Sequence, residues 1–367
     1  MLWLLLACTP PPPPLPLECR VLAAPTPGLL AERRAKATAP LEIAAIFVEE
    51  GRLSGDGGYY ELAANAVSCA KSQQGETPAV LLAEGQGLLQ LHRFAQAEEV
   101  GRRLRGVQDG AEAQLLVADA LFEQGKLEDA AAIYEGMLRR SEAPALLGRV
   151  AWLRQAWGDW DGALELWEKA AQRPMKEEDL AWVLAQQGWL RAQLGQPAPQ
   201  LDMAIRLVPG YSEALLFRGR VRAFQGDREG AIADLRLAGP RWDARRALAE
   251  LEGGSPLADC RLDRRGCALY LADHDPEQAA KWMVEELAAR QDATTLAYAA
   301  YVDFRRGREA RTGMEAALAT GIRDPQVLLV AGIVLGDPAR VQAALSPGVG
   351  LFAEERARGQ AVVAALP

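Results

Sequence analysis

Histidine, cationic stretches and long apolar runs are all scarce in this 367-residue chain, and each scarcity argues against a class of function. The chain has two histidines, His92 and His274, and it has no Gly-rich phosphate loop, G-x-S-x-G elbow or Cys-x-x-Cys pair. His274 precedes Asp275-Pro276, which is more simply a helix N-cap with proline in the first turn than a metal site. We therefore predict no catalytic residues, no metal site and no cofactor.

The charge balance argues against nucleic acid as a partner. The net charge is −8 and the pI is about 5.2, whereas nucleic-acid binding requires a basic stripe. The run Arg102-Arg103-Leu104-Arg105 has acidic residues nearby, which is typical of a solvated helix face. Ala, Leu, Glu, Gln and Arg dominate while β-branched residues are sparse, so helix is favoured nearly throughout.

The stretch Gly158 to Pro174 carries the clearest periodic pattern. Gly158-Asp159 predicts a turn, and the apolar residues after it recur at helical spacing until a proline ends the helix: Trp160, Ala163, Leu166, Trp167, Ala170 and Pro174. A second apolar stripe upstream ends at the same glycine. Such a helix–turn–helix unit is too small to bury its own apolar faces and is stable only when copies stack.

Turn residues recur along the chain at His92, Gly125, Gly158, Gly195 and Gly226. The first two intervals are both 33 residues, and the next two are 37 and 31. Small residues recur where the two helices of a unit cross: Gly85, Ala118, Ala151, Gly188 and Gly219, with Ala97, Ala130, Ala163 and Ala231 opening the second helices. A period of about 34 with this pattern resembles the tetratricopeptide repeat family. The resemblance implies an all-α, right-handed superhelical solenoid, with the repeat array over residues 41–240 and degenerate helical repeats or a C-terminal helical cap over 241–367.

Tryptophans at equivalent repeat positions suggest a binding surface. Trp152 follows Ala151, and Trp189 follows Gly188 in the same way. In the tetratricopeptide family this position faces the concave groove, where ligand peptides lie. The same mapping places further residues in a partner-binding groove: Trp182, Phe122, Arg220 and Phe224. The expected partner is another protein or peptide. The alternative is a tightly wound groove that is partly filled by its own side chains.

The N-terminal run Met1 to Cys8 is far too short to span a bilayer, which needs about 20 residues. Leu5-Leu6-Ala7-Cys8 resembles the lipobox of bacterial lipoproteins, in which the signal is cleaved before the cysteine and its thiol then carries a diacylglycerol. The resemblance implies a signal peptide over residues 1–7, although no Lys or Arg precedes the apolar run. It also implies a lipid on Cys8 and a Pro/Ala-rich tether over residues 8–40, which begins with the prolines Pro10 to Pro14.

The remaining cysteines are Cys19, Cys69, Cys260 and Cys267, and four cysteines can pair in three ways. Cys260 with Cys267 is the local choice for a disulfide, and free buried thiols are the alternative. An exported protein permits disulfides, whereas a cytosolic one keeps its thiols reduced.

Together these features predict a non-catalytic protein–protein interaction scaffold. The resemblances place it in the bacterial cell envelope, lipid-anchored through Cys8 and facing the periplasm, with the outer membrane as the expected site. There it would assist the assembly or organisation of an envelope complex. The alternative is a cytosolic tetratricopeptide scaffold or adaptor whose N-terminus is misassigned.

Overall fold

The computed structural model describes residues 17–23, 30–257, 260 and 263–365, and the regular structure within these ranges is entirely helical. The signal peptide and the lipidation site Cys8 that the sequence predicts lie outside the described residues. A 3-10 helix, η1 (Leu17–Ala23), comes first. The helices of the N-terminal half are α1 (Ala31–Lys36), α2 (Pro40–Ser54), α3 (Gly58–Gln74), α4 (Pro78–Gln90), α5 (Phe94–Val107), α6 (Ala111–Glu123), α7 (Leu127–Leu138), α8 (Pro144–Ala156), α9 (Trp160–Ala171), α10 (Glu177–Gln193) and α11 (Gln200–Leu207).

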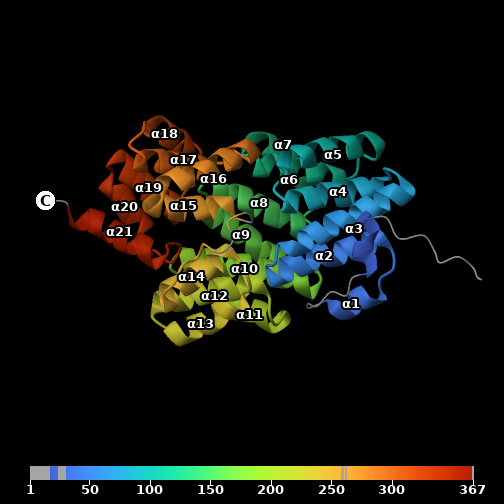
Figure 1. The fold of residues 1–367 in the computed structure, drawn as a ribbon, viewed down its shortest axis with the longest axis horizontal. Coiled ribbons are helices and arrows are strands. Elements are labelled where there is room, and N and C mark those ends of the chain that lie inside the picture. The colour runs from blue at the N-terminus through green and yellow to red at the C-terminus, as the bar shows by residue number, and fades with distance from the viewer. Residues whose placement is uncertain (1–16, 24–29, 258–259, 261–262, 366–367) are drawn as a thin grey trace, which may run out of the picture.

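The helices of the C-terminal half are α12 (Ser212–Gln225), α13 (Arg228–Leu237), α14 (Trp242–Glu252), α15 (Arg264–His274), α16 (Pro276–Ala289), α17 (Ala293–Arg305), α18 (Arg311–Leu318), α19 (Pro325–Leu335), α20 (Pro338–Ala344) and α21 (Ala353–Ala364). Consecutive helices pack as pairs from α2 with α3 to α12 with α13. After the single helix α14, the pairing resumes with α15 and α16 and continues to α19 and α20. The all-α solenoid of tetratricopeptide-like units is therefore confirmed (Figure 1).

The turns and crossings lie where the sequence pattern predicts them. The turn residues His92, Gly125 and Gly158 have left-handed φ values of 56°, 82° and 75°. The crossing residues Ala118 and Ala151 are fully buried, because only a small side chain permits the close approach of two helices there. The 33-residue spacing thus marks one structural unit.

The core is a series of clusters that each join neighbouring units. One cluster joins α6, α7 and α8 and contains Val117 and Tyr134. The next joins α8, α9 and α10 around Trp167, which has no exposed surface. Each unit is therefore stabilised mainly by its neighbours, as expected for a repeat array.

The solenoid winds tightly enough to close on itself. Helix α2 contacts α12, five units further along the chain. At this contact a Cβ on Gly239 would lie 2.6 Å from the carbonyl oxygen of Ser54. Nearby, Arg52 on α2 lies 3.5 Å from the carboxylate of Asp179 on α10. Helices α2 to α12 therefore form one closed turn of the superhelix, whose inner wall is made by the first helix of each unit.

The C-terminal helices begin a second turn, which packs on the first (Figure 1). The backbone N–H of Gln291 donates to the carbonyl of Gln124 at 3.2 Å, and Arg323 donates to the carbonyl of Gly158 at 3.4 Å. The second pair is 165 residues apart, which is five of the 33-residue repeats. Successive turns of the superhelix thus meet about every five units.

The expected tether is folded wherever the structure describes it. Cys19 of η1 forms a disulfide with Cys69 of α3, and both side chains are buried. The guanidinium of the buried Arg34 donates to the carbonyl of Leu22 at 2.7 Å. In its described part, the segment predicted as a tether over residues 8–40 packs on the repeat array, because a disulfide and a buried arginine hold η1 and α1 there.

Candidate functional site

Two adjoining cavities, of about 590 and 430 Å³, lie inside the first turn of the superhelix. We call them together the interior groove. Helices α2, α4, α6, α8 and α10 all contribute to its lining, and the two cavities share Arg52, Leu89, Gln90, Asp119, Ala145, Arg149 and Asp179. The groove is therefore built from the concave faces of successive units, because the first helix of each unit faces inward.

The floor of the larger cavity is apolar. Helix α2 contributes Leu41, Ala44 and Val48, and α6 contributes Leu115 and Leu116. These side chains line a cavity and also pack in the adjacent core clusters. An apolar side chain of a ligand could therefore be buried there without leaving a polar group unpaired.

Three aromatic residues predicted for the groove line its smaller cavity: Phe122, Trp152 and Trp182. The rings of Trp152 and Trp182 meet edge to face at 5.3 Å, and the buried Trp167 supports both from behind. The indole N–H of Trp152 donates to Gln186 at 3.4 Å. The aromatic wall is therefore rigidly held by its neighbours.

Trp189 occupies a different place. Its ring stacks on Phe217 at 4.8 Å with an interplanar angle of 9°. It lines a separate cavity of about 320 Å³ that lies between the two turns of the superhelix, together with Phe122 and Trp160. The equivalence of Trp152 and Trp189 in the repeat does not extend to their surroundings, since the second turn covers only one of them.

Arg220, which the repeat pattern assigns to the groove, does not line either of its cavities. Its guanidinium donates to the carbonyl of Gly350 at 2.7 Å and lies 4.3 Å from the ring centroid of Phe352. Phe224 is 39% exposed, but it lies under the guanidinium of Arg356 and does not line the interior groove. Both residues contact a segment of the second turn, so here the chain itself covers the surface that the repeat pattern assigns to a ligand.

The charges at the centre of the groove are mutually paired. Arg149 donates to both carboxylate oxygens of Asp119, at 2.6 and 2.7 Å, and Asp119 also accepts from the hydroxyl of Tyr134 at 2.7 Å. Burial lowers the pKa of Arg149, but the adjacent Asp119 carboxylate outweighs it and raises the pKa overall. Burial, assisted by Asp119, raises the pKa of Tyr134 well above its usual value.

The inner end of the groove holds two half-buried ionisable groups, His92 and Glu123. Burial and the charge of Arg290 lower the pKa of His92 to about 4, so the imidazole is neutral at pH 7. Burial raises the pKa of Glu123, against the opposing charge of Arg290 at 3.4 Å. The sequence identified His92 as a turn residue, but its burial by the second turn has no signal in the repeat pattern.

The second disulfide of the structure joins Cys260 and Cys267, as the local pairing predicts. It links Cys260 to Cys267 on α15. The carboxylate of Asp275 accepts from the backbone N–H of Gln278 at 3.0 Å, so the Asp275-Pro276 pair does cap α16. Within the described ranges no cluster of His, Cys, Asp or Glu could hold a metal ion, and no helix is long and apolar enough to cross a membrane.

No protein family and no curated protein matches this chain. Solved structures do resemble it. A structure of the APC/C hetero-tetramer Cut9–Hcn1 is 14% identical, with a TM-score of 0.43 over 91% of this chain and 64% of that one. The human IFIT1 dimer with PPP-AAAA is 15% identical, with a TM-score of 0.43 over 89% and 72%. A tetratricopeptide repeat protein from Parabacteroides merdae is 12% identical, with a TM-score of 0.35 over 80% and 98%. This chain thus spans about 64% of the length of the chain in the Cut9–Hcn1 structure.

Proposed function

We propose that this chain is a non-catalytic scaffold that binds a segment of another protein in its interior groove. The observation that carries the proposal is the combination of an apolar floor with a rigid aromatic wall, Phe122, Trp152 and Trp182, inside one cavity system. Tryptophan and tyrosine dominate the binding energy of protein interfaces when they line well-packed pockets. A groove between helices also suits the burial of the apolar face of a peptide.

The lining of the groove favours binding over covalent chemistry. Its residues include no serine, threonine or cysteine that could act as a nucleophile. The carboxylate of Asp119 is saturated by Arg149 and Tyr134, and His92 is held neutral by burial. The groove therefore offers surface and shape to a ligand.

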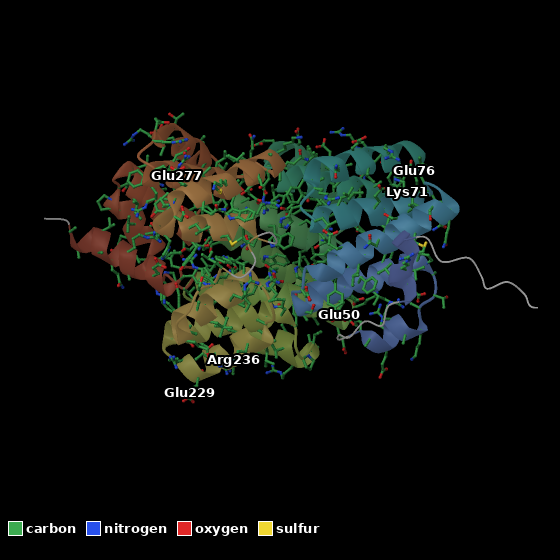
Figure 2. All side chains as sticks on the ribbon, in the orientation of Figure 1. Glu50, Lys71, Glu76, Glu229, Arg236 and Glu277 are labelled. Atoms are coloured by element: carbon green, nitrogen blue, oxygen red, sulfur yellow. A yellow bond between two sulfur atoms is a disulfide. The ribbon has the colours of Figure 1, made fainter. Side chains whose placement is uncertain are left out.

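Site-specific photo-crosslinking tests the use of the groove. Gln86 is exposed and lines the larger cavity, whereas Glu229 is exposed on the outer helix α13, where its side chain points away from the body (Figure 2). A benzophenone amino acid at position 86 should crosslink a discrete partner in cells, and the same group at position 229 should not. Crosslinking of the same partner at both positions, or at position 229 alone, would refute groove binding.

Two tryptophan variants sharpen this test. Trp152→Ala truncates the groove wall, and losing such an interface residue often weakens binding by about 2 kcal/mol or more. Trp189→Ala removes a ring that lies outside the groove, so the crosslink at position 86 should persist. The proposal fails if the two variants reduce the crosslink equally while both remain folded by circular dichroism.

We also propose that the scaffold works in the bacterial envelope, anchored by a lipid on Cys8, where it assists the assembly of an envelope complex. The Leu5-Leu6-Ala7-Cys8 pattern supports the anchor, and the disulfide between Cys19 and Cys69 suits an oxidising compartment. Labelled palmitate should enter the wild-type chain and not the Cys8→Ser variant. An unlabelled chain with reduced cysteines would instead favour the cytosolic scaffold.

A further inference from the structure

Acidic residues outnumber basic ones in the lining of the interior groove. The carboxylates are Glu49, Glu112, Asp119, Glu123, Glu178 and Asp179. The cations are Arg52, Arg149 and Lys176. A ligand with positive charge is therefore favoured over one with negative charge, provided that these charges are available to it.

The two arginines are already committed to partners. Arg149 is held by Asp119 through two hydrogen bonds, and Arg52 lies 3.5 Å from Asp179 across the closure of the ring. An acidic ligand would have to compete with these carboxylates for the arginines and would stand beside their negative charge. Only Lys176, which is exposed, remains for such a ligand.

Two carboxylates of the larger cavity are available. Glu112 is exposed at the start of α6, and Glu178 is half-buried at the start of α10. Within the described part of the chain neither makes an ion pair or a side-chain hydrogen bond. Each lies in the first turn of its helix, where the helix dipole offsets about half a unit of charge and leaves the carboxylate net negative.

These acids stand on the same cavity as the apolar floor formed by Leu41, Val48 and Leu115. We infer that the interior groove recognises a basic, amphipathic segment of a partner protein, with apolar side chains on the floor and Lys or Arg beside Glu112 and Glu178. This inference rests on the proposed function of the groove. It adds the chemistry of the ligand, which the repeat pattern leaves open.

Three synthetic peptides test the inference on the full chain. Each has 14 residues with leucine at positions i, i+3, i+4 and i+7. The remaining positions are all lysine in the first peptide, all glutamate in the second and all glutamine in the third. Fluorescence anisotropy should show that the lysine peptide binds most tightly and that its affinity falls as salt rises, because the acidic rim is exposed. Equal binding of the lysine and glutamate peptides, or binding independent of salt, would overturn the inference.

A matched pair of charge reversals separates the groove from the overall acidity of the protein. Glu112→Lys with Glu178→Lys should weaken the lysine peptide by about tenfold. Glu229→Lys with Glu285→Lys changes the net charge by the same amount at exposed sites on α13 and α16, and it should have little effect. Equal losses in the two double variants would assign the binding to net charge and overturn the inference.

The crosslinker at Gln86 distinguishes the two possible failures. Capture of the lysine peptide at position 86, with none at position 229, places it in the groove as inferred. If a cellular partner crosslinks at position 86 while the lysine peptide shows no preference, the proposed function stands and the ligand chemistry is overturned. If neither a partner nor a peptide is captured at position 86, the proposed function and the inferred ligand chemistry are both refuted.

Discussion

Gly125→Ala should weaken the contact between the two turns of the superhelix. Gly125 has a left-handed φ of 82°, which costs alanine about 1–2 kcal/mol. The new Cβ would also lie 2.7 Å from the backbone nitrogen of Asp292 and 2.8 Å from its Cα. Backbone atoms cannot turn aside as a flexible side chain can, so the loop must move at an additional cost of about 1–3 kcal/mol, as in an overpacked core.

Gly226→Ala is the matched control for this substitution. Gly226 is the turn residue between α12 and α13, three units further along the chain, with a φ of 86°, but a Cβ there would meet no atom within 4 Å. The free energy of unfolding of this variant should therefore fall only by the cost of a left-handed alanine, about 1–2 kcal/mol. The difference between the two free energies of unfolding isolates the contact between the turns.

Hydrogen exchange reports directly on that contact. The amide of Gln291 donates to the carbonyl of Gln124, next to the substituted glycine, so exchange at this amide should accelerate in Gly125→Ala and remain unchanged in Gly226→Ala. Urea unfolding of both variants supplies the free energies. Equal destabilisation of the two, with Gln291 equally protected in both, would refute the packing of the second turn on the first.

Three further predictions concern other buried features. Cys19→Ser removes the disulfide to Cys69, so it should lower the free energy of unfolding by about 2–5 kcal/mol and speed proteolysis of the N-terminal segment. If a reductant changes neither the stability nor the proteolysis of the wild type, this bond is absent. The pKa of His92 is about 4 in the fold against 6.5 when unfolded, so stability should be lost as the pH falls from 6.5 to 4, by at most roughly 3 kcal/mol. His92→Gly, which tolerates the left-handed turn, should show a smaller loss over that pH range in thermal melts. Glu355→Ala removes the carboxylate that lies 2.9 Å from the buried Arg246, so it should lower the free energy of unfolding by about 3–5 kcal/mol. Adding Arg246→Met should restore most of that stability in chemical denaturation, because no unpaired buried charge then remains.

The local architecture could be predicted from the sequence because each unit is specified by nearby residues. Gly158 needs a left-handed turn, and Ala151 and Ala163 must be small where helices cross, so their spacing reveals the repeat. The same register groups Trp152 with Trp182, and both line one cavity of the structure. These inferences require only the geometry of one unit and its neighbour.

The pitch of the superhelix could not be predicted in this way. It results from small rotations accumulated over about five units, and no residue within one unit records their sum. Arg220 therefore has the register of a groove residue, yet Gly350 and Phe352 cover it from 130 residues further along the chain. The composition of the N-terminal segment likewise does not reveal that the segment packs on the repeat array. A Pro/Ala-rich stretch is typical of a linker, whereas two specific residues, Cys19 and Arg34, hold it on the repeat array.

The tight winding bears directly on how a partner would bind. The contact of α2 with α12 and the pair between Arg52 and Asp179 close the groove along one side, which favours entry of a ligand segment along the axis of the superhelix. Because the wall is formed by packed helices and by Trp152 held against Trp182, little ordering of the protein is required on binding. If the groove binds as proposed, the charge at its rim and the shape of its floor would select the ligand. This is why reversal of Glu112 and Glu178 should alter the choice of ligand while leaving the fold intact.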